Sequence, residues 1–287
     1  MKIITNTASL FTQEEGKQLG ISIIPVTVSL GGRSLRDYID ISSDEYVNLL
    51  HGDEMPVSSQ PSIGDMLEQL EDIDEEAIMI TVADGLSGEY NTAMGLRNSL
   101  PNKDKIYVIN SRSLAGSLRY MAVKAASLRD RGLTAGEVAA QILECAQSTV
   151  SYVIPADFNY LRKSGRINNL TSKIGSALHL LPVLTQSEDR RRISLMTVRR
   201  TWKAAADIII NSLKEKGIDE RWLVSVAYAE KGHRRKGMPP DRRDLPPGGN
   251  RAPAALPFSD HTRRPRLCRR TDSPQIMGAN VPAVISV

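Results

Sequence analysis

The chain has 287 residues, 41% of them hydrophobic, which is enough to bury a sizeable core. A chain of this length is too long for a single small core, so two domains are expected. It carries 37 Lys and Arg against 33 Asp and Glu, a formal net charge of +4. No apolar run approaches the roughly 20 residues that cross a bilayer, and the start lacks a secretory pattern, so we expect a cytoplasmic protein.

The positive charge is concentrated at the end of the chain. Residues 231–287 hold 12 Lys and Arg and 4 Asp and Glu, whereas residues 1–230 hold 25 and 29. The larger part is therefore slightly acidic, and we expect no nucleic-acid partner for it. An arginine-rich arm that contacts nucleic acid or an acidic membrane remains an alternative for the tail alone.

Strand and helix patterns alternate along the first half of the chain. Residues 2–4 predict a strand, Thr12 and Glu15 have the spacing of a capping box, and residues 21–30 predict a strand rich in β-branched side chains. Residues 42–45 suit another helix start. This alternation predicts an α/β fold whose N-terminal domain, residues 1–156, is built on a parallel sheet.

Two loops carry hydroxyl groups beside predicted helix starts. Ser58 and Ser59 precede Pro61, which restricts the backbone and precedes a helical pattern at residues 64–70. Ser87 lies between two glycines, after the apolar strand 77–82, at the start of another helix. Ligands of open α/β sheets bind at the carboxyl ends of strands, so the two loops can converge on one small anion such as a carboxylate.

The second half continues the alternation and then loses it. A strand at 106–109, two helices, and a strand at 149–154 complete the first domain, and a cationic turn at 159–167 opens the second, residues 157–287. Strands at 193–198 and 223–229 flank an amphipathic helix at 201–216 in that α/β domain. By their composition, which is rich in Arg, Pro and Gly, residues 231–275 are irregular or diverged, and apolar character returns at 276–279 and 281–287. The abrupt change suggests that part of this tail is read out of frame.

Three stretches, in this order, resemble the DegV family of fatty-acid-binding proteins. Residues 58–62 are similar to the family's Thr-Ser-Gln-Pro motif, residues 84–93 to its Ser-Gly-Leu-Ser-Gly-Thr-Tyr stretch, and residues 161–167 to its Leu-Lys-Lys-Gly-Gly-Arg-Ile turn. Asp84 and Glu89 depart from the second motif. Weaker similarities include Asn6-Thr7, where the family has Asp-Ser, and Arg200-Thr201. The resemblance covers roughly residues 1–230.

The resemblance implies a DegV (EDD-like) fold that encloses a long-chain fatty acid, such as palmitate or oleate, between two domains. In that case Ser58 and Ser87 bind the carboxylate, and Ser59 and Gly88 shape the two loops. The family also implies that the acid is presented to a fatty acid kinase, with Arg166 and Arg200 facing the phosphate or the kinase. His261 matches a loop histidine, although Arg263-Arg264 replace the glycine that follows it. Transient membrane contact fits such a carrier.

The sequence contains no evident catalytic site, so we expect a non-catalytic binding protein without cofactor or metal. Residues 85–88, Gly-Leu-Ser-Gly, lack the Gly-x-Ser-x-Gly spacing of a nucleophile elbow. The histidines are His51, His179, His233 and His261, and the cysteines are Cys145 and Cys268, without metal-ligand spacing. A serine-dependent hydrolase or a phosphotransferase-like enzyme is the alternative.

Overall fold

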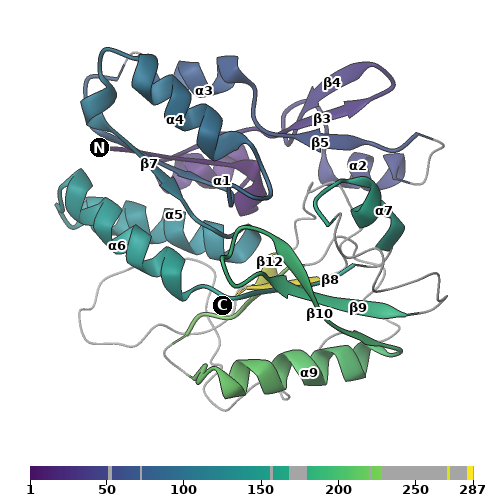
Figure 1. Cartoon of the computed structure of the whole chain (residues 1–287). Helices are drawn as coiled ribbons and strands as arrows, with labels where there is room; N and C mark the ends of the chain where they lie inside the picture. The colour runs from purple at the N-terminus through teal and green to yellow at the C-terminus, as the bar shows by residue number, and fades with distance from the viewer. Residues whose placement is uncertain are drawn as a thin grey trace.

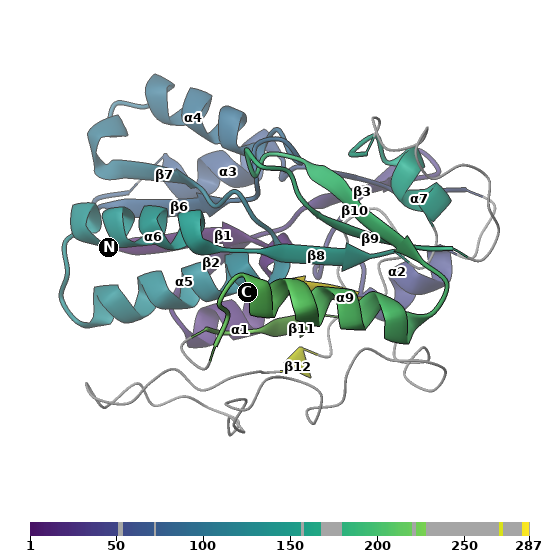
Figure 2. The ribbon, with the colours of Figure 1, turned by 60° about the horizontal axis from the view of Figure 1, so that its bottom comes forward.

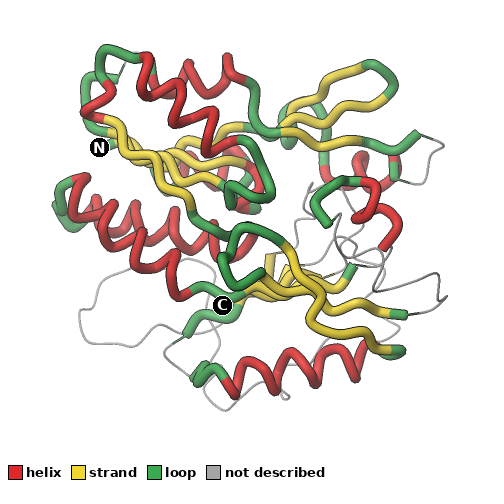
Figure 3. The backbone as a smooth tube through the Cα atoms, in the orientation of Figure 1, coloured by secondary structure: helices red, strands yellow, loops and turns green. Residues whose placement is uncertain are grey.

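The computed structural model describes residues 1–50, 54–71, 73–155, 158–167, 180–219, 222–227, 270–271 and 283–286. In this part of the chain every helix is too short or too polar to span a bilayer. Strands form a parallel sheet, a mixed sheet and a small antiparallel sheet, with helices packed around them (Figure 3). The predicted α/β class with an N-terminal parallel sheet is confirmed.

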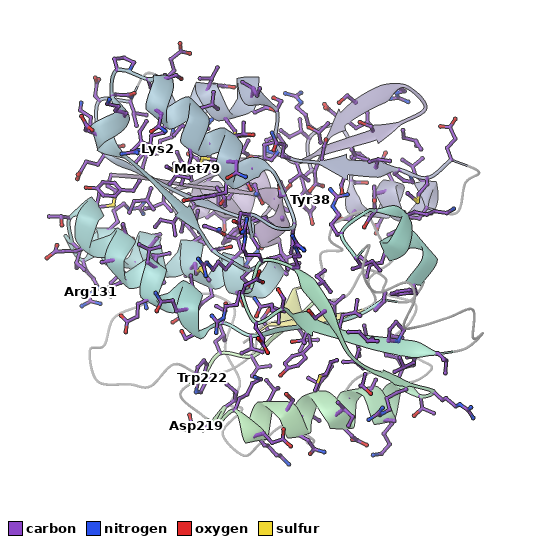
Figure 4. All side chains as sticks on the ribbon, in the orientation of Figure 1. Lys2, Tyr38, Met79, Arg131, Asp219 and Trp222 are labelled. Atoms are coloured by element: carbon purple, nitrogen blue, oxygen red, sulfur yellow. The ribbon has the colours of Figure 1, made fainter. Side chains whose placement is uncertain are left out.

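The parallel sheet has the strand order β2-β1-β6-β7 and is covered by helices on both faces (Figure 1). Side chains of successive strand residues point to opposite faces, so Ile3 packs with α5 and α6 whereas Ile4 packs with α3 and α4. Met79 of β6 likewise faces α4 (Figure 4). The strands are β1 (Lys2–Asn6), β2 (Ile21–Ile24), β6 (Ala77–Thr81) and β7 (Ile106–Asn110).

Three helices of the first 150 residues begin with capping boxes, at Thr12, Ser42 and Thr134, and the helix starts predicted at Thr12 and at residues 42–45 are confirmed. In each, the hydroxyl accepts from the backbone N–H three residues on, and the Glu at that position accepts from the capping residue. The helices are α1 (Gln13–Gln18), α2 (Ser43–Leu49), α3 (Ile63–Leu70), α4 (Glu89–Ser99), α5 (Ala115–Asp130) and α6 (Ala135–Ser148), with 3-10 turns η1 (Thr7–Ser9) and η2 (Lys103–Lys105).

The prediction of one strand over residues 21–30 is wrong. This stretch forms two strands in different sheets, β2 (Ile21–Ile24) and β3 (Thr27–Leu30), separated at Pro25. Proline lacks the N–H that a continuous ladder needs, so the chain leaves the parallel sheet there. β3 is the centre of the antiparallel sheet β4-β3-β5, with β4 (Arg33–Arg36) and β5 (Val57–Ser59) at its edges.

The second large sheet has the order β10-β9-β8-β13-β11-β12, with α9 against one face (Figure 2). The strand and helix predicted at 193–198 and 201–216 are present as β10 and α9. The elements are β8 (Ser151–Ile154), α7 (Phe158–Lys163), β9 (Leu181–Gln186), β10 (Ile193–Arg199), α9 (Trp202–Glu215), β11 (Ser225–Ala227), β12 (Arg270–Thr271) and β13 (Ala283–Ser286).

Strand pairing bears on the predicted division at residue 156. That division leaves β8 in the N-terminal domain, yet β8 pairs with β9 and β13 of the second sheet. The division itself stays a prediction, and the pairing favours a boundary between α6 and β8. The predicted irregular segment 231–275 lies outside the described residues except for Arg270 and Thr271, which form β12. The apolar end of the chain supplies β13, between β8 and β11.

The packing of α1 on β2 gives a test of the fold. A Cβ atom at Gly16 would lie 2.3 Å from Ile23 Cγ1 and 2.7 Å from the Ile21 carbonyl oxygen. Because the backbone cannot yield easily, Gly16→Ala is expected to lower the free energy of unfolding by about 1–3 kcal/mol. Gly95, inside α4, has nothing within 4 Å of such an atom, so Gly95→Ala should raise it by about 0.5–1 kcal/mol. Urea unfolding measures both, and shifts of the same sign would contradict this packing.

Candidate functional site

The loop that carries Ser58 begins on an edge strand. Ser58 lies in β5, paired with Val28 of β3, and is half-buried, whereas Ser59 is exposed. The serine that caps the following helix is Ser62, whose hydroxyl accepts from the backbone N–H of Asp65 at 3.0 Å. Ser58 and Ser59 are therefore not needed as helix caps, which leaves their hydroxyls available for another role.

The loop that carries Ser87 follows the fully buried strand β6 and leads into α4. The backbone N–H groups of Leu86 and Ser87 both donate to the Ala83 carbonyl, at 2.9 and 3.1 Å, which closes a tight turn. Gly88 is the N-cap and offers no side chain to the first turn, while the Ser87 hydroxyl accepts from the Glu89 N–H at 3.2 Å. The half-buried Ser87 hydroxyl thus lies at the positive end of an 11-residue helix.

Gln60 joins the two loops. Its side-chain amide donates to the Thr92 hydroxyl of α4 at 2.9 Å. A Cβ atom at Gly88 would lie 2.6 Å from Gln60 Oε1, so a residue with a side chain at that position would push the loops apart. The two loops therefore lie side by side, and the missing side chain at Gly88 leaves room for Gln60. That their hydroxyls converge on one anion stays a prediction.

Arg166 brings the third motif to the same place. It follows α7, and its guanidinium donates to the carbonyl of Ser58 at 3.0 Å and to the carbonyl of Ser164 at 2.8 Å. Leu161 and Ile167 on either side are buried in the large core. The guanidinium therefore holds β5 against the second half of the chain, a contact that spans 108 residues of sequence.

Two predicted residues are not brought to these loops by the described contacts. Arg200 is exposed, between the end of β10 and Thr201, which caps α9. It follows the last residue of the seven-residue β10, at the end away from the turn that joins β9 and β10. A strand of that length spans about 20 Å, which separates Arg200 from this turn. His261 lies outside the described residues, as do the other three histidines.

Glu89 is a site residue that the sequence indicates only as a departure from the family motif. Its side chain is fully buried, and its carboxylate accepts from the Asn6 amide and, at 3.1 Å, from the Val82 N–H. Burial raises the pKa of Glu89 to about 7, against which these two hydrogen bonds act. Oε1 has no partner within the described residues. A Glu in the first turn of a helix is common, so its burial could not be read from the sequence.

A second buried carboxyl group, that of Asp37 after β4, contacts Thr7, the residue that follows β1. Asp37 is 1% exposed and accepts from the Thr7 hydroxyl, and burial raises its pKa to about 7. The Thr7 oxygen in turn accepts from the Val26 N–H at 3.1 Å. The carboxyl edge of the parallel sheet thus carries two carboxyl groups that are readily neutral, so an anion there meets less repulsion than the charge count suggests.

The β9–β10 hairpin presses on the base of the Ser87 loop. A Cβ atom at Gly85 would lie 1.9 Å from the Arg191 carbonyl oxygen, and the Arg191 guanidinium pairs with Asp84 at 2.9 Å. The Gln186 amide donates to the Arg112 carbonyl at 2.8 Å on the same side. Among the described residues no group of three or more His, Cys, Asp or Glu side chains could hold a metal ion. The half-buried hydroxyls of Ser58 and Ser87 are polar groups that could bind a carboxylate here.

Comparison with known proteins shows which family the chain belongs to. A family model described as "Uncharacterised protein, DegV family" matches residues 1–239. The chain belongs to the DegV family. The DegV domain-containing protein SA1258 of Staphylococcus aureus is 29% identical over 231 residues, which cover 79% of this chain and 81% of that protein. The family membership that the three motifs predict is confirmed.

Solved DegV structures share the fold. The Bacillus subtilis DegV protein, solved as a fatty-acid-binding protein, has a TM-score of 0.70 at 23% identity, covering 81% of this chain and 83% of that one. A stearic-acid-binding protein from Eubacterium ventriosum has a TM-score of 0.71 at 21% identity, with the same coverage. At this level of identity the similarity establishes the DegV fold, and the ligands are those of the two neighbours.

The buried Glu89 predicts a pH-dependent stability. Its pKa rises from the ordinary 4.5 to about 7 on folding, so the folded state holds a proton that the unfolded state has lost, and the free energy of unfolding falls as pH rises between these values. Glu89→Gln keeps an acceptor without the charge. We therefore expect the difference in free energy of unfolding between the variant and wild type to shift in favour of the variant by on the order of 1–3 kcal/mol from pH 5 to pH 8.

Denaturant unfolding at both pH values measures this difference. Glu14→Gln, on an exposed helix position, is the control and should not change the profile. Asp37 keeps its own raised pKa in both proteins, so part of the slope persists. A Glu89→Gln profile parallel to that of wild type would show that Glu89 does not titrate in this range.

Proposed function

We propose that this chain binds a long-chain fatty acid such as palmitate or oleate, with the carboxylate held by the hydroxyls of Ser58 and Ser87. The observation that carries the proposal is the pair of contacts, Gln60 to Thr92 and Arg166 to the Ser58 carbonyl, that gathers the three motifs around one place. The fatty acids bound by the two structural neighbours support the same ligand class.

Neutral donors suit this task. A hydroxyl at a helix N-terminus binds a carboxylate without burying an opposing charge, whose desolvation would be costly. Ser59 and Gly88 shape the loops, Gly88 by leaving room for Gln60. A protonated Glu89 behind Ser87 adds no repulsion toward the incoming carboxylate.

We further propose that the acyl chain lies between the two domains. Leu86 of the Ser87 loop and Leu114 before α5 belong to one core with Val153 and Leu184 of the second sheet. An apolar chain that enters between the loops meets apolar side chains from both sheets there. Burial of a chain of this length is strongly favourable, at about 0.8 kcal/mol per methylene group.

Organic extraction of the purified full-length protein tests the ligand class. Denaturing mass spectrometry of the extract is expected to reveal a long-chain acid that co-purifies. Ser87→Ala should weaken palmitate binding by about 1–3 kcal/mol, since an acceptor loses its buried donor. Titration calorimetry measures this loss.

The matched control is Ser99→Ala at the other end of α4, where the exposed hydroxyl donates to the Leu96 carbonyl; its palmitate affinity should not change. An empty extract that stays empty after incubation with palmitate and oleate would contradict the proposal. Covalent labelling of Ser87 by a fluorophosphonate would instead favour the hydrolase.

Presentation of the bound acid to a fatty acid kinase is the second part of the proposal. Arg200 is exposed and makes no described contact with the two serine loops, so it suits contact with a partner, whereas Arg166 also braces β5. Arg200→Ala is expected to leave palmitate affinity unchanged and to slow phosphorylation of the bound acid by a fatty acid kinase about tenfold. Lys214→Ala, exposed on α9, is the control. A loss of palmitate affinity in Arg200→Ala would place Arg200 in the ligand site instead.

A further inference from the structure

A cavity lies between α5, α6 and the segment that leads into β11. Its volume is about 460 Å³, within the ~300–1,000 Å³ that small-molecule sites occupy. It is on the face of the parallel sheet that α5 and α6 cover, whereas Ser58 and Gln60 lead into α3 on the opposite face (Figure 1). None of the residues of the two serine loops lines it among the described residues.

The α5 wall presents hydrogen-bond donors. Ser117, Tyr120 and Lys124 follow one another at spacings of three and four residues, which places them on one face of the helix. Ser117 is 4% exposed, and its hydroxyl has no partner within the described part of the chain. Lys124 is half-buried and forms no ion pair with the described residues. Buried donors are normally satisfied, so this wall calls for an acceptor.

The facing wall combines the apolar side chains of Cys145, Trp222 and Leu223 with the hydroxyl groups of Ser148, Thr149 and Ser225. Cys145 of α6 and Trp222, which stands beside the end of α9 in Figure 4, lie across from α5 together with Leu223. Burial is the main cause that raises the pKa of the Cys145 thiol, so the thiol stays neutral. Glu144 is the carboxylate among the lining residues and is exposed at the rim.

We propose that this cavity is a second binding site, for a small planar anion such as an aromatic carboxylate or sulfonate. The ring would lie against Trp222 and Cys145, and the anionic group would accept from Ser117 and Lys124. This site is separate from the proposed fatty-acid site and does not depend on it.

The fluorescent probe 8-anilinonaphthalene-1-sulfonate has this chemistry and tests the proposal on the full-length chain. We expect saturable binding that Lys124→Gln weakens about tenfold, the effect of losing one charge-assisted hydrogen bond. Lys103→Gln, at an exposed position in η2, is the matched control and should bind as wild type does. Equal affinities in the two variants would overturn the proposal.

Alkylation of Cys145 by iodoacetamide locates the probe. Bound probe is expected to slow alkylation of Cys145 but not of Cys268, as measured by peptide mass spectrometry, and excess palmitate should not restore the rate. Restoration by palmitate would assign the probe to the fatty-acid site and overturn the second site. A protein that fails to bind palmitate but protects Cys145 would remove the proposed function and leave this one standing.

Discussion

The buried carboxyl group of Glu89 fixes the geometry on which the site depends. It accepts hydrogen bonds from Asn6 at the end of β1 and from Val82 just after β6, and so ties the start of α4 to two central strands. The backbone N–H of the same residue donates to the Ser87 hydroxyl. Ser87 is thereby placed by the sheet as well as by the turn that its own backbone N–H closes on Ala83. Because a buried carboxyl without donors would be costly, these contacts and the loop conformation stabilise each other.

Contacts between distant parts of the chain then assemble the rest around this loop. Gln60 joins the Ser58 strand to α4, and Arg166 joins the same strand to the turn after α7. The hairpin of the second sheet closes on Gly85. Its ion pair with Asp84 is partly exposed and contributes little, so the close backbone approach determines this contact. Each loop alone is an ordinary turn, and these contacts bring the loops together at the candidate site.

Much of the fold follows from local patterns. The three capping boxes are self-contained within four residues each, and their hydroxyl and carboxylate partners are adjacent in sequence. The strand β6 is an uninterrupted apolar run because helices cover both of its faces. The division of residues 21–30 at Pro25 could also have been read, since proline disfavours a continuous strand. The sheet to which β8 belongs could not be predicted in this way, because the sequence of a short apolar strand does not indicate which sheet it joins.

The sequence by itself determined the family, the alternation of strands and helices, and the serines and glycines of the two loops, because these depend on residue type and short spacing. Tertiary structure decided which polar groups are buried and what they touch. The raised pKa of Glu89 arises from burial, against which the hydrogen bonds from residues 6 and 82 act, and the Arg166 contact crosses 108 residues. No local pattern encodes such contacts, since burial and hydrogen bonding between distant residues exist only once the sheets and helices have packed.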